Sequence, residues 1–292
     1  MFEQQYQKMA EAPGFVAALD QSGGSTPRTL QRYGVEAWAD EAEMFEKVHA
    51  MRSRIMASPS FDGDRILATI LFAQTVDREV DGRPTPEFLW EAKHIVPILK
   101  VDKGLEEERD GAQLMKDIDG LDELLADALA KGVFGTKMRS VVRAPGAGAE
   151  AAVAQQLYLG RRILAAGLVP ILEPEVDITS PQKAEAERHV HDLLAVGLDD
   201  LPEGERVMLK LTLPEHDDLY ADLVAHPRVL RVFALSGGYS RAEATERLAR
   251  QHGVVASFAR ALMEGLNINQ SDEEFDAVLD SSIAEIYAAS MA

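Results

Sequence analysis

The feature that most constrains the fold is a series of short apolar runs spaced along the whole chain. We count eight: GFVAALD (14–20), RILATILF (65–72), HIVPILKVD (94–102), FGTKMRS (134–140), LVPILEPEV (168–176), RVMLKLTL (206–213), RVLRVFALS (228–236) and VVASFAR (254–260). They are apolar on successive residues rather than on alternate ones. That pattern is typical of parallel strands covered by helices, so we expect eight such strands.

The segments between these runs carry helix signals. An apolar stripe at helical spacing precedes Gly132 and consists of Leu121, Leu124, Leu125, Ala128 and Leu129. Ser240 with Glu243 and Ser271 with Glu274 have the spacing of capping boxes and predict the starts of two later helices. Residues 1–12 predict a short helical extension before the first strand, and the helix after Ser271 predicts a helical end to the chain.

Eight strand and helix units in 292 residues predict an α/β fold, a single (β/α)8 barrel whose one domain spans residues 1–292. The first crossover is expected to be longer than the others. The alternative is an open, doubly wound sheet. Its usual G-x-G-x-x-G fingerprint is missing from residues 14–27, which favours the barrel.

Charge and composition exclude several kinds of partner. The formal net charge of -19 repels nucleic acid and anionic membrane surfaces, so we expect neither as a partner. The absence of cysteine excludes disulfides, thiolate nucleophiles and cysteine metal sites, and it fits a cytoplasmic protein. No signal-peptide pattern or membrane-spanning run is found. The oligomeric state stays open.

Polar side chains gather at the carboxyl ends of the predicted strands, where barrel enzymes carry their active sites. They are Asp20; Lys100, Asp102 and Lys103; Lys137 and Arg139; Glu173 and Glu175; Lys210; Ser236; and Ser257 and Arg260. For any one of them, a solvated charge at a strand end is the simpler interpretation. Together they predict one polar mouth.

Lys210 stands apart because VMLKLTL places it inside an apolar run, where an unpaired ammonium is expensive to bury. It should be paired, neutral or reactive. With Lys137 nearby its pKa would fall, and the amine could attack carbonyls. Glu173 and Glu175 point the same way along a strand, so repulsion would raise one carboxyl pKa and leave an acid able to dehydrate a carbinolamine. A solvated acidic pair is the alternative.

Two glycine-rich loops follow strands, DQSGGS (20–25) and LSGGYS (235–240). Their exposed backbone N–H groups are suited to holding phosphate, although similar sequences occur in ordinary turns. Lys100 lies near the first loop in strand order, and Arg260 lies near the second.

Seven segments in this order resemble the class I, Schiff-base-forming fructose-bisphosphate aldolases in their bacterial form: AALDQSGGS, LKVDKG, GTKMRS, EPEV, MLKLT, LSGGYS and SFARAL. The resemblance spans nearly the whole chain. It implies reversible cleavage of fructose 1,6-bisphosphate to dihydroxyacetone phosphate and glyceraldehyde 3-phosphate. Sugar phosphates would be the partners, and no metal or cofactor would be needed.

The resemblance also implies residue roles. Lys210 would form the Schiff base, Glu173 would act as acid and base at the carbinolamine, and Lys137 would stabilise that step. Asp20 would take the C4 hydroxyl proton, and Glu175 would support the site. The C6 phosphate would bind Ser22, Ser25, Lys100 and Arg139, and the C1 phosphate would bind Ser236, Gly237, Gly238 and Arg260. We add Ser257, beside Arg260 in sequence, to the substrate-binding set.

The chain departs from the animal members of the family at three points. Gln21 replaces a glutamate, Ala259 replaces a glycine, and Tyr287 lies in a predicted helix where animal enzymes end on a catalytic tyrosine. The group that protonates the enamine is therefore open.

Three rival functions differ in their chemistry. Another Schiff-base barrel aldolase would also need a strand-end lysine, but two phosphate loops favour a bisphosphate. A non-catalytic phosphosugar-binding barrel would not need the intact reactive set. A zinc enzyme would need clustered histidines, whereas the seven here are scattered, and His189 and His191 lie on a predicted outer helix.

Overall fold

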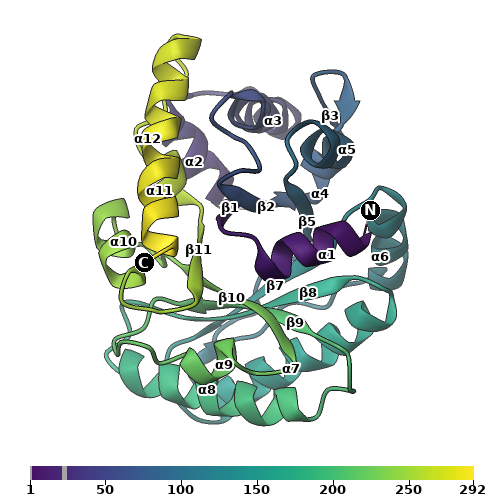
Figure 1. Ribbon diagram of the computed structural model, residues 1–292, viewed down its shortest axis with the longest axis vertical. Coiled ribbons are helices and arrows are strands. Elements are labelled where there is room, and N and C mark those ends of the chain that lie inside the picture. Colours follow the sequence, from purple (N-terminus) through teal and green to yellow (C-terminus); the bar gives the residue numbers. More distant parts are fainter. Residues whose placement is uncertain (1, 22–24) are drawn as a thin grey trace.

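A computed structural model describes residues 2–21 and 25–292, and it contains a closed ring of eight parallel strands (Figure 1). The strands are β1 (Phe15–Leu19), β2 (Ile66–Phe72), β5 (Val96–Lys100), β7 (Gly135–Val142), β8 (Val169–Val176), β9 (Val207–Thr212), β10 (Val229–Leu235) and β11 (Val254–Phe258). Each pairs in parallel with the next, and β11 pairs with β1. The predicted (β/α)8 barrel and all eight of its strands are confirmed.

Helices surround this ring. The first crossover, which is the longest as predicted, contains α2 (Ser25–Tyr33) and α3 (Glu41–Ala57). The others are α4 (Ala73–Val76), α5 (Thr85–Glu87), the π-helical turn η1 (Phe88–Ala92), α6 (Leu121–Ala130), α7 (Ala147–Ala165), α8 (Lys183–Asp199), α9 (Ala221–Val224), α10 (Arg241–Leu248), α11 (Arg260–Met263) and α12 (Asp272–Ser290). None of the helices in the described ranges is long and apolar enough to cross a membrane.

The predicted N-terminal extension is α1 (Phe2–Glu11), which crosses the amino end of the barrel (Figure 1). Its Lys8 ammonium donates to the Gly63 carbonyl at 2.6 Å, just before β2. The Arg231 guanidinium on β10 donates to the Ala10 and Ala12 carbonyls at 2.9 and 3.1 Å. These bonds close the end of the barrel opposite the carboxyl ends of the strands.

Short elements that the sequence did not predict lie at the rim. A hairpin of β3 (Glu79–Val80) and β4 (Arg83–Pro84) follows β2. The strand β6 (Ala112–Gln113) pairs antiparallel with the carboxyl end of β7. They hold the loops that follow β2 and β5.

Both predicted helix caps are found, with one difference. At α12 the Ser271 side chain and the Glu274 carboxylate complete a capping box, whereas at α10 Ser240 accepts the Glu243 N–H. Two other predictions are wrong. Leu129 is 45% exposed, because the buried side of α6 is formed by Leu121, Leu125 and Ala128. Arg260 does not belong to a strand, since β11 ends at Phe258 and Arg260 opens α11.

The contact between α8 and α9 leads to a pH prediction. Burial alone would lower the pKa of His191, but hydrogen bonds to Asp222 and Asp192 outweigh it and raise that pKa. A raised pKa stabilises the fold below the unfolded value of about 6.5, and this contribution is lost as pH rises through the folded value. The free energy of unfolding should therefore fall between about pH 6 and pH 8. We expect His191→Gln to make this fall smaller, by up to about 1 kcal/mol.

Urea unfolding at the two pH values measures this effect. His189→Gln is the matched control, because His189 lies on the same helix but approaches Glu150 only to 3.8 Å. An equal effect of both substitutions would contradict the assignment to the Asp222 contact.

Candidate active site

A cavity of about 590 Å³ opens at the carboxyl ends of the strands. The predicted site residues that line it are Asp20, Ser25, Lys100, Lys137, Arg139, Glu173, Glu175, Lys210, Ser236, Gly237, Ser257 and Arg260. Gly238 instead lines a neighbouring cavity, and Ser22 lies outside the described residues. The barrel thus brings twelve residues from seven strand ends to one place.

Four buried charged side chains form the base of this cavity. The Lys210 ammonium lies 3.0 Å from Glu173 Oε1, and the Lys137 ammonium lies 2.8 Å from Glu173 Oε2. Lys137 also lies 2.8 Å from Asp20 Oδ2. All four are at most 7% exposed. The result is a chain of alternating charges, Lys210 to Glu173 to Lys137 to Asp20, which we call the ion chain.

The ion chain fixes the charge states of its inner members. Burial alone would raise the pKa of Asp20, but the charges of Lys137, Lys210 and Lys100 hold it well below its usual range. Burial alone would lower the pKa of Lys137, but Asp20, Glu173 and Asp102 raise it above its ordinary value. Lys137 therefore stays protonated. Lys210, by contrast, forms an ion pair with only one carboxylate of the described residues, that of Glu173.

Strand register explains this convergence. Lys137 is the register partner of Lys100, the last residue of β5, so the two lysines lie at the same level of the barrel although Lys137 is only the third residue of β7. Glu173 and Glu175 do point the same way, but they do not act on each other as an isolated acidic pair. Glu173 contacts two lysines, and Glu175 binds Arg139 at 2.9 Å.

A buried glutamine, Gln156, holds the backbone of Glu173 in place. The Gln156 amide on α7 donates to the Met138 carbonyl at 3.2 Å and to Ser140 Oγ at 3.1 Å, and its oxygen accepts the Glu173 N–H at 3.3 Å. These bonds join α7, β7 and β8. The sequence carried no signal for this role, because a glutamine in a helix is usually solvated.

The cations on the β5 and β7 side of the cavity are already paired. The Lys100 ammonium lies 2.6 Å from Asp102 Oδ1 and donates to the Asp102 carbonyl at 3.0 Å. Burial alone would lower the pKa of Arg139, but Glu175 and Glu173 raise it. The other oxygen of Asp102 is buried without a hydrogen bond among the described residues. An anion arriving here would share Lys100 and Arg139 with carboxylates.

The loop after β10 has a different character. Gly237 and Gly238 have φ angles of +58° and +130°, which favour glycine. A Cβ at Gly238 would lie 3.2 Å from the Arg260 guanidinium, so the glycine lets that side chain lie against the loop. Arg260 is exposed and has no ion pair among the described residues. This side of the cavity therefore offers an unpaired cation.

Arg52 on α3 is a functional candidate that sequence reasoning missed. It is only 2% exposed, and it donates to Thr75 Oγ1 at 2.7 Å and to the Gln21 carbonyl at 2.5 Å. Burial lowers its pKa to about 10, and the charge of Asp20 acts in the opposite direction. In the sequence, Arg52 has the helical spacing of Val48, Met51 and Ile55, which form the buried side of α3. This spacing could have indicated that Arg52 is buried.

No tyrosine is among the described residues that line this cavity. Tyr287 is part of α12 and packs against the core, as its predicted helix implies. The described residues also contain no group of three histidine, aspartate or glutamate side chains arranged to hold a metal ion. Among the described residues, the reactive groups at the base of the cavity are therefore the amines and carboxylates of the ion chain.

Comparisons with known proteins agree with this geometry. The family model described as "Glycolytic: Fructose-bisphosphate aldolase class-I" matches residues 3–212. A "Fructose-bisphosphate aldolase class 1" from Synechocystis sp. is 59% identical, covering 99% of this chain and 97% of the relative. Proteins of that name from Porphyromonas gingivalis and Clostridium acetobutylicum are 52% and 49% identical, with complete coverage of both chains.

A solved structure supports the fold. The fructose-bisphosphate aldolase from Plasmodium falciparum, in a ternary crystal with TRAP and a small-molecule inhibitor, matches with a TM-score of 0.79 at 22% identity. The match covers 99% of this chain and 93% of that one. At this identity the likeness concerns the barrel alone. The family match and the three full-length bacterial relatives show that this chain belongs to the class I fructose-bisphosphate aldolases.

Proposed function

We propose that this protein cleaves fructose 1,6-bisphosphate reversibly into dihydroxyacetone phosphate and glyceraldehyde 3-phosphate through a Schiff base on Lys210. The observation that carries this proposal is the buried Lys210 amine, 3.0 Å from Glu173 at the base of the cavity. A lysine in such a position can attack a ketose carbonyl when its proton passes to a neighbouring carboxylate.

The ion chain supplies the proton transfers. After the Lys210 nitrogen bonds to C2, the carbinolamine hydroxyl leaves as water with a proton from Glu173. Lys137, fixed as a cation, stabilises the Glu173 carboxylate that this transfer produces. Asp20 then takes the C4 hydroxyl proton as the C3–C4 bond breaks, releasing the aldehyde and leaving an enamine on Lys210.

The last steps return the enzyme to its starting state. The enamine carbon takes up a proton, and hydrolysis of the resulting imine frees dihydroxyacetone phosphate and the amine. Because no tyrosine is among the described residues that line this cavity, we assign this proton to a carboxylic acid or a water of the cavity. The imine is the electrophile, so we propose that the reaction needs no metal ion or cofactor.

Cations on both sides of Lys210 support a bisphosphate substrate: Lys100 and Arg139 on one side, and Arg260 on the other. We place the C1 phosphate at Ser236, Gly237 and Arg260, with Gly238 shaping the loop. We place the C6 phosphate at Ser25, Lys100 and Arg139, joined by Ser22 outside the described residues. Ser257, whose buried hydroxyl has no hydrogen-bond partner among the described residues, faces the same cavity and is assigned to the substrate.

Two broader proposals accompany this function. The chain forms one domain, because residues from β1 to β11 build a single ring and α12 packs on it. The lack of cysteine and the small anionic substrates fit a cytoplasmic enzyme.

We also propose that Arg52 positions Gln21, the residue that follows Asp20. Its guanidinium holds the Gln21 carbonyl, the first peptide oxygen after Asp20, and anchors it to Thr75 beyond β2. A buried arginine is costly unless its donors are used, and the bonds to Gln21 and Thr75 use two of them. The Gln21 carbonyl also accepts from Thr26 Oγ1 at 3.5 Å, next to Ser25, so Arg52 would act on the distal-phosphate site through Gln21 without touching the reacting atoms.

The Schiff base is tested by reduction. Borohydride added with dihydroxyacetone phosphate should label Lys210 covalently and abolish activity, while EDTA should leave activity unchanged because the imine acts as the electrophile. Peptide mass spectrometry of the labelled protein identifies the lysine, and Lys210→Arg is the control that keeps the charge. Labelling elsewhere, or loss of activity on chelation that zinc restores, would refute this mechanism.

The two phosphate sites are tested by comparing two substrates. Lys100→Ala should weaken use of fructose 1,6-bisphosphate by about ten- to a hundredfold and spare fructose 1-phosphate, which lacks the distal phosphate. Arg260→Ala should weaken the use of both sugars. Steady-state kcat/KM values for the four combinations decide the matter. Equal losses for Lys100→Ala on both sugars would mean that the sites are wrongly assigned.

The role of Arg52 is tested with the same pair of sugars. Arg52→Met should raise KM for the bisphosphate by about tenfold or more and change KM for fructose 1-phosphate little, and Arg52→Lys should recover part of the loss. Thr75→Val is the matched control, since it removes a partner of Arg52 but keeps the bond to Gln21. Losses of equal size on both sugars in Arg52→Lys would indicate a purely structural role.

A further inference from the structure

The reaction proposed above makes no use of one buried ion pair on α8. Lys183 and Glu187 are at most 5% exposed, and the Lys183 ammonium pairs with the Glu187 carboxylate. Lys183 also donates to the Leu213 carbonyl at 2.9 Å, three residues after Lys210 on the chain. Charges buried this deeply are costly unless they are paired, so these contacts fix the position of both side chains.

Glu215, in the loop after β9, connects this ion pair to α10. Its backbone N–H donates to Glu187 Oε2 at 3.0 Å, and its Oε1 lies 2.9 Å from the Lys183 ammonium. The same oxygen accepts from Arg247 Nη1 at 3.5 Å. Arg247 lies on α10, where its Nε is also 3.3 Å from Glu243 Oε1. Two carboxylates therefore fix the direction of the Arg247 guanidinium.

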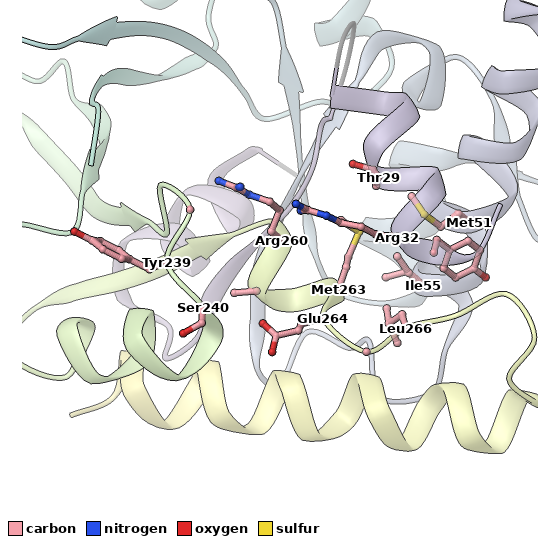
Figure 2. A pocket seen from close by; sticks show the side chains of 14 residues that line it. Thr29, Arg32, Met51, Ile55, Tyr239, Ser240, Arg260, Met263, Glu264 and Leu266 are labelled. Carbon is pink, nitrogen blue, oxygen red and sulfur yellow. The ribbon is translucent and has the colours of Figure 1, made fainter. Parts of the chain in front are cut away.

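The Arg247 guanidinium lies over the ring of Tyr239. Its Cζ atom is 4.4 Å from the centre of that ring, which is the geometry of a cation–π contact. The Tyr239 ring is half-buried against the core, and Figure 2 shows it pointing away from Arg260. The residues joined in this way form one connected group, which we call the loop anchor: Lys183, Glu187, Glu215, Arg247 and Tyr239.

The loop anchor ends at the loop to which we assigned the C1 phosphate. Tyr239 directly follows Gly237 and Gly238, and its N–H closes the turn by donating to the Ser236 carbonyl at 2.9 Å. Two successive glycines give this loop unusual conformational freedom and no side chain that could fix it. A Cβ at Gly237 would lie 2.6 Å from Ile178 Cγ2, so the close approach of Ile178 also favours glycine. Tyr239 is therefore the first side chain after the glycines that can hold the loop.

We infer that the loop anchor positions the C1-phosphate loop through the contact of Arg247 with Tyr239, and that the affinity for the C1 phosphate depends on this contact. The phosphate then meets a loop that already has its binding conformation, so less binding free energy is lost in ordering the two glycines. Arg247 and Tyr239 are positioning residues, because neither is among the described residues that line the active-site cavity. The inference rests on the proposed C1-phosphate role of Ser236 and Gly237.

Steady-state kinetics of one variant and its control test the inference. Arg247→Met should raise KM for fructose 1-phosphate and for fructose 1,6-bisphosphate by about three- to tenfold. It should change kcat little, because the ion chain keeps its geometry. Arg250→Met is the matched control and should leave both KM values unchanged. Arg250 lies just after the same helix and binds Asp217 in the loop after β9 at 3.1 Å, whereas the cation–π contact with Tyr239 is made by Arg247.

Conservative variants separate the ring contact from a general loss of structure. Tyr239→Phe keeps the ring and should keep the affinity, whereas Tyr239→Leu removes the ring and should behave like Arg247→Met. Arg247→Lys retains a cation that can lie over the ring, so it should recover part of the loss. Tyr239→Leu and Arg247→Met remove the same contact from its two sides, so the test does not depend on the folding of one variant.

Trapping with two ketones shows whether the effect concerns the phosphate. Dihydroxyacetone phosphate carries the phosphate that becomes the C1 phosphate of the sugar, and dihydroxyacetone lacks it, while both can form an imine on Lys210. In Arg247→Met, half-maximal labelling with borohydride should need about three- to tenfold more dihydroxyacetone phosphate and an unchanged concentration of dihydroxyacetone. Quantitative mass spectrometry of the Lys210 peptide measures both.

Equal rises for the two ketones would overturn the inference, because the loss would then not concern the phosphate. Equal effects of Arg247→Met and Arg250→Met would also overturn it, as would equal losses in Tyr239→Phe and Tyr239→Leu, since the ring contact would then contribute nothing. Failure of the proposed function would look different. The unchanged protein would then show no labelling of Lys210 by either ketone, which would refute both proposals, whereas the outcomes above refute this inference alone.

Discussion

The site depends on one interaction, the buried ion chain that runs from Lys210 through Glu173 and Lys137 to Asp20. Each of these charges would be expensive to bury alone, and each is offset by a neighbour of opposite sign. Lys210, Glu173 and Lys137 come from adjacent strands. Asp20 follows β1, which pairs with β2 and β11, so its contact with Lys137 spans the ring. The ion chain can form only when the barrel is closed.

The ion chain and the phosphate sites divide the cations of the mouth into two kinds. Lys137, Lys100 and Arg139 are held by carboxylates, which fixes their positions and leaves them to be shared with substrate. Arg260 has no such partner among the described residues, and it lies between two cavities. A strongly acidic protein can thus present an unpaired cation where an anion must bind, while its other cations stay fixed.

Patterns in the sequence predicted the elements well because they report local geometry. Continuous apolar runs identified the eight strands, and serine with glutamate three residues later marked two helix starts. The two wrong predictions, for Leu129 and for the end of β11, also came from reading local patterns. Leu129 fits a helical stripe but lies at its solvent edge, and the run VVASFAR continues past the strand because Ala259 and Arg260 carry no signal that β11 ends at Phe258.

The sequence by itself determined which residues stand at the strand ends, that a lysine lies inside an apolar strand, and which family the chain resembles. Only the tertiary structure decided which charges pair, because residues such as Asp20 and Lys137 meet across more than a hundred positions. It also revealed Arg52 and Gln156, whose partners lie on other elements. The neighbouring cavity that Gly238 lines is formed by α2 and α3 together with α11, which follows them by more than two hundred residues. The periodicity of a sequence indicates which face of a helix or strand a residue occupies. Which residue it contacts on that face depends on how the barrel folds and closes.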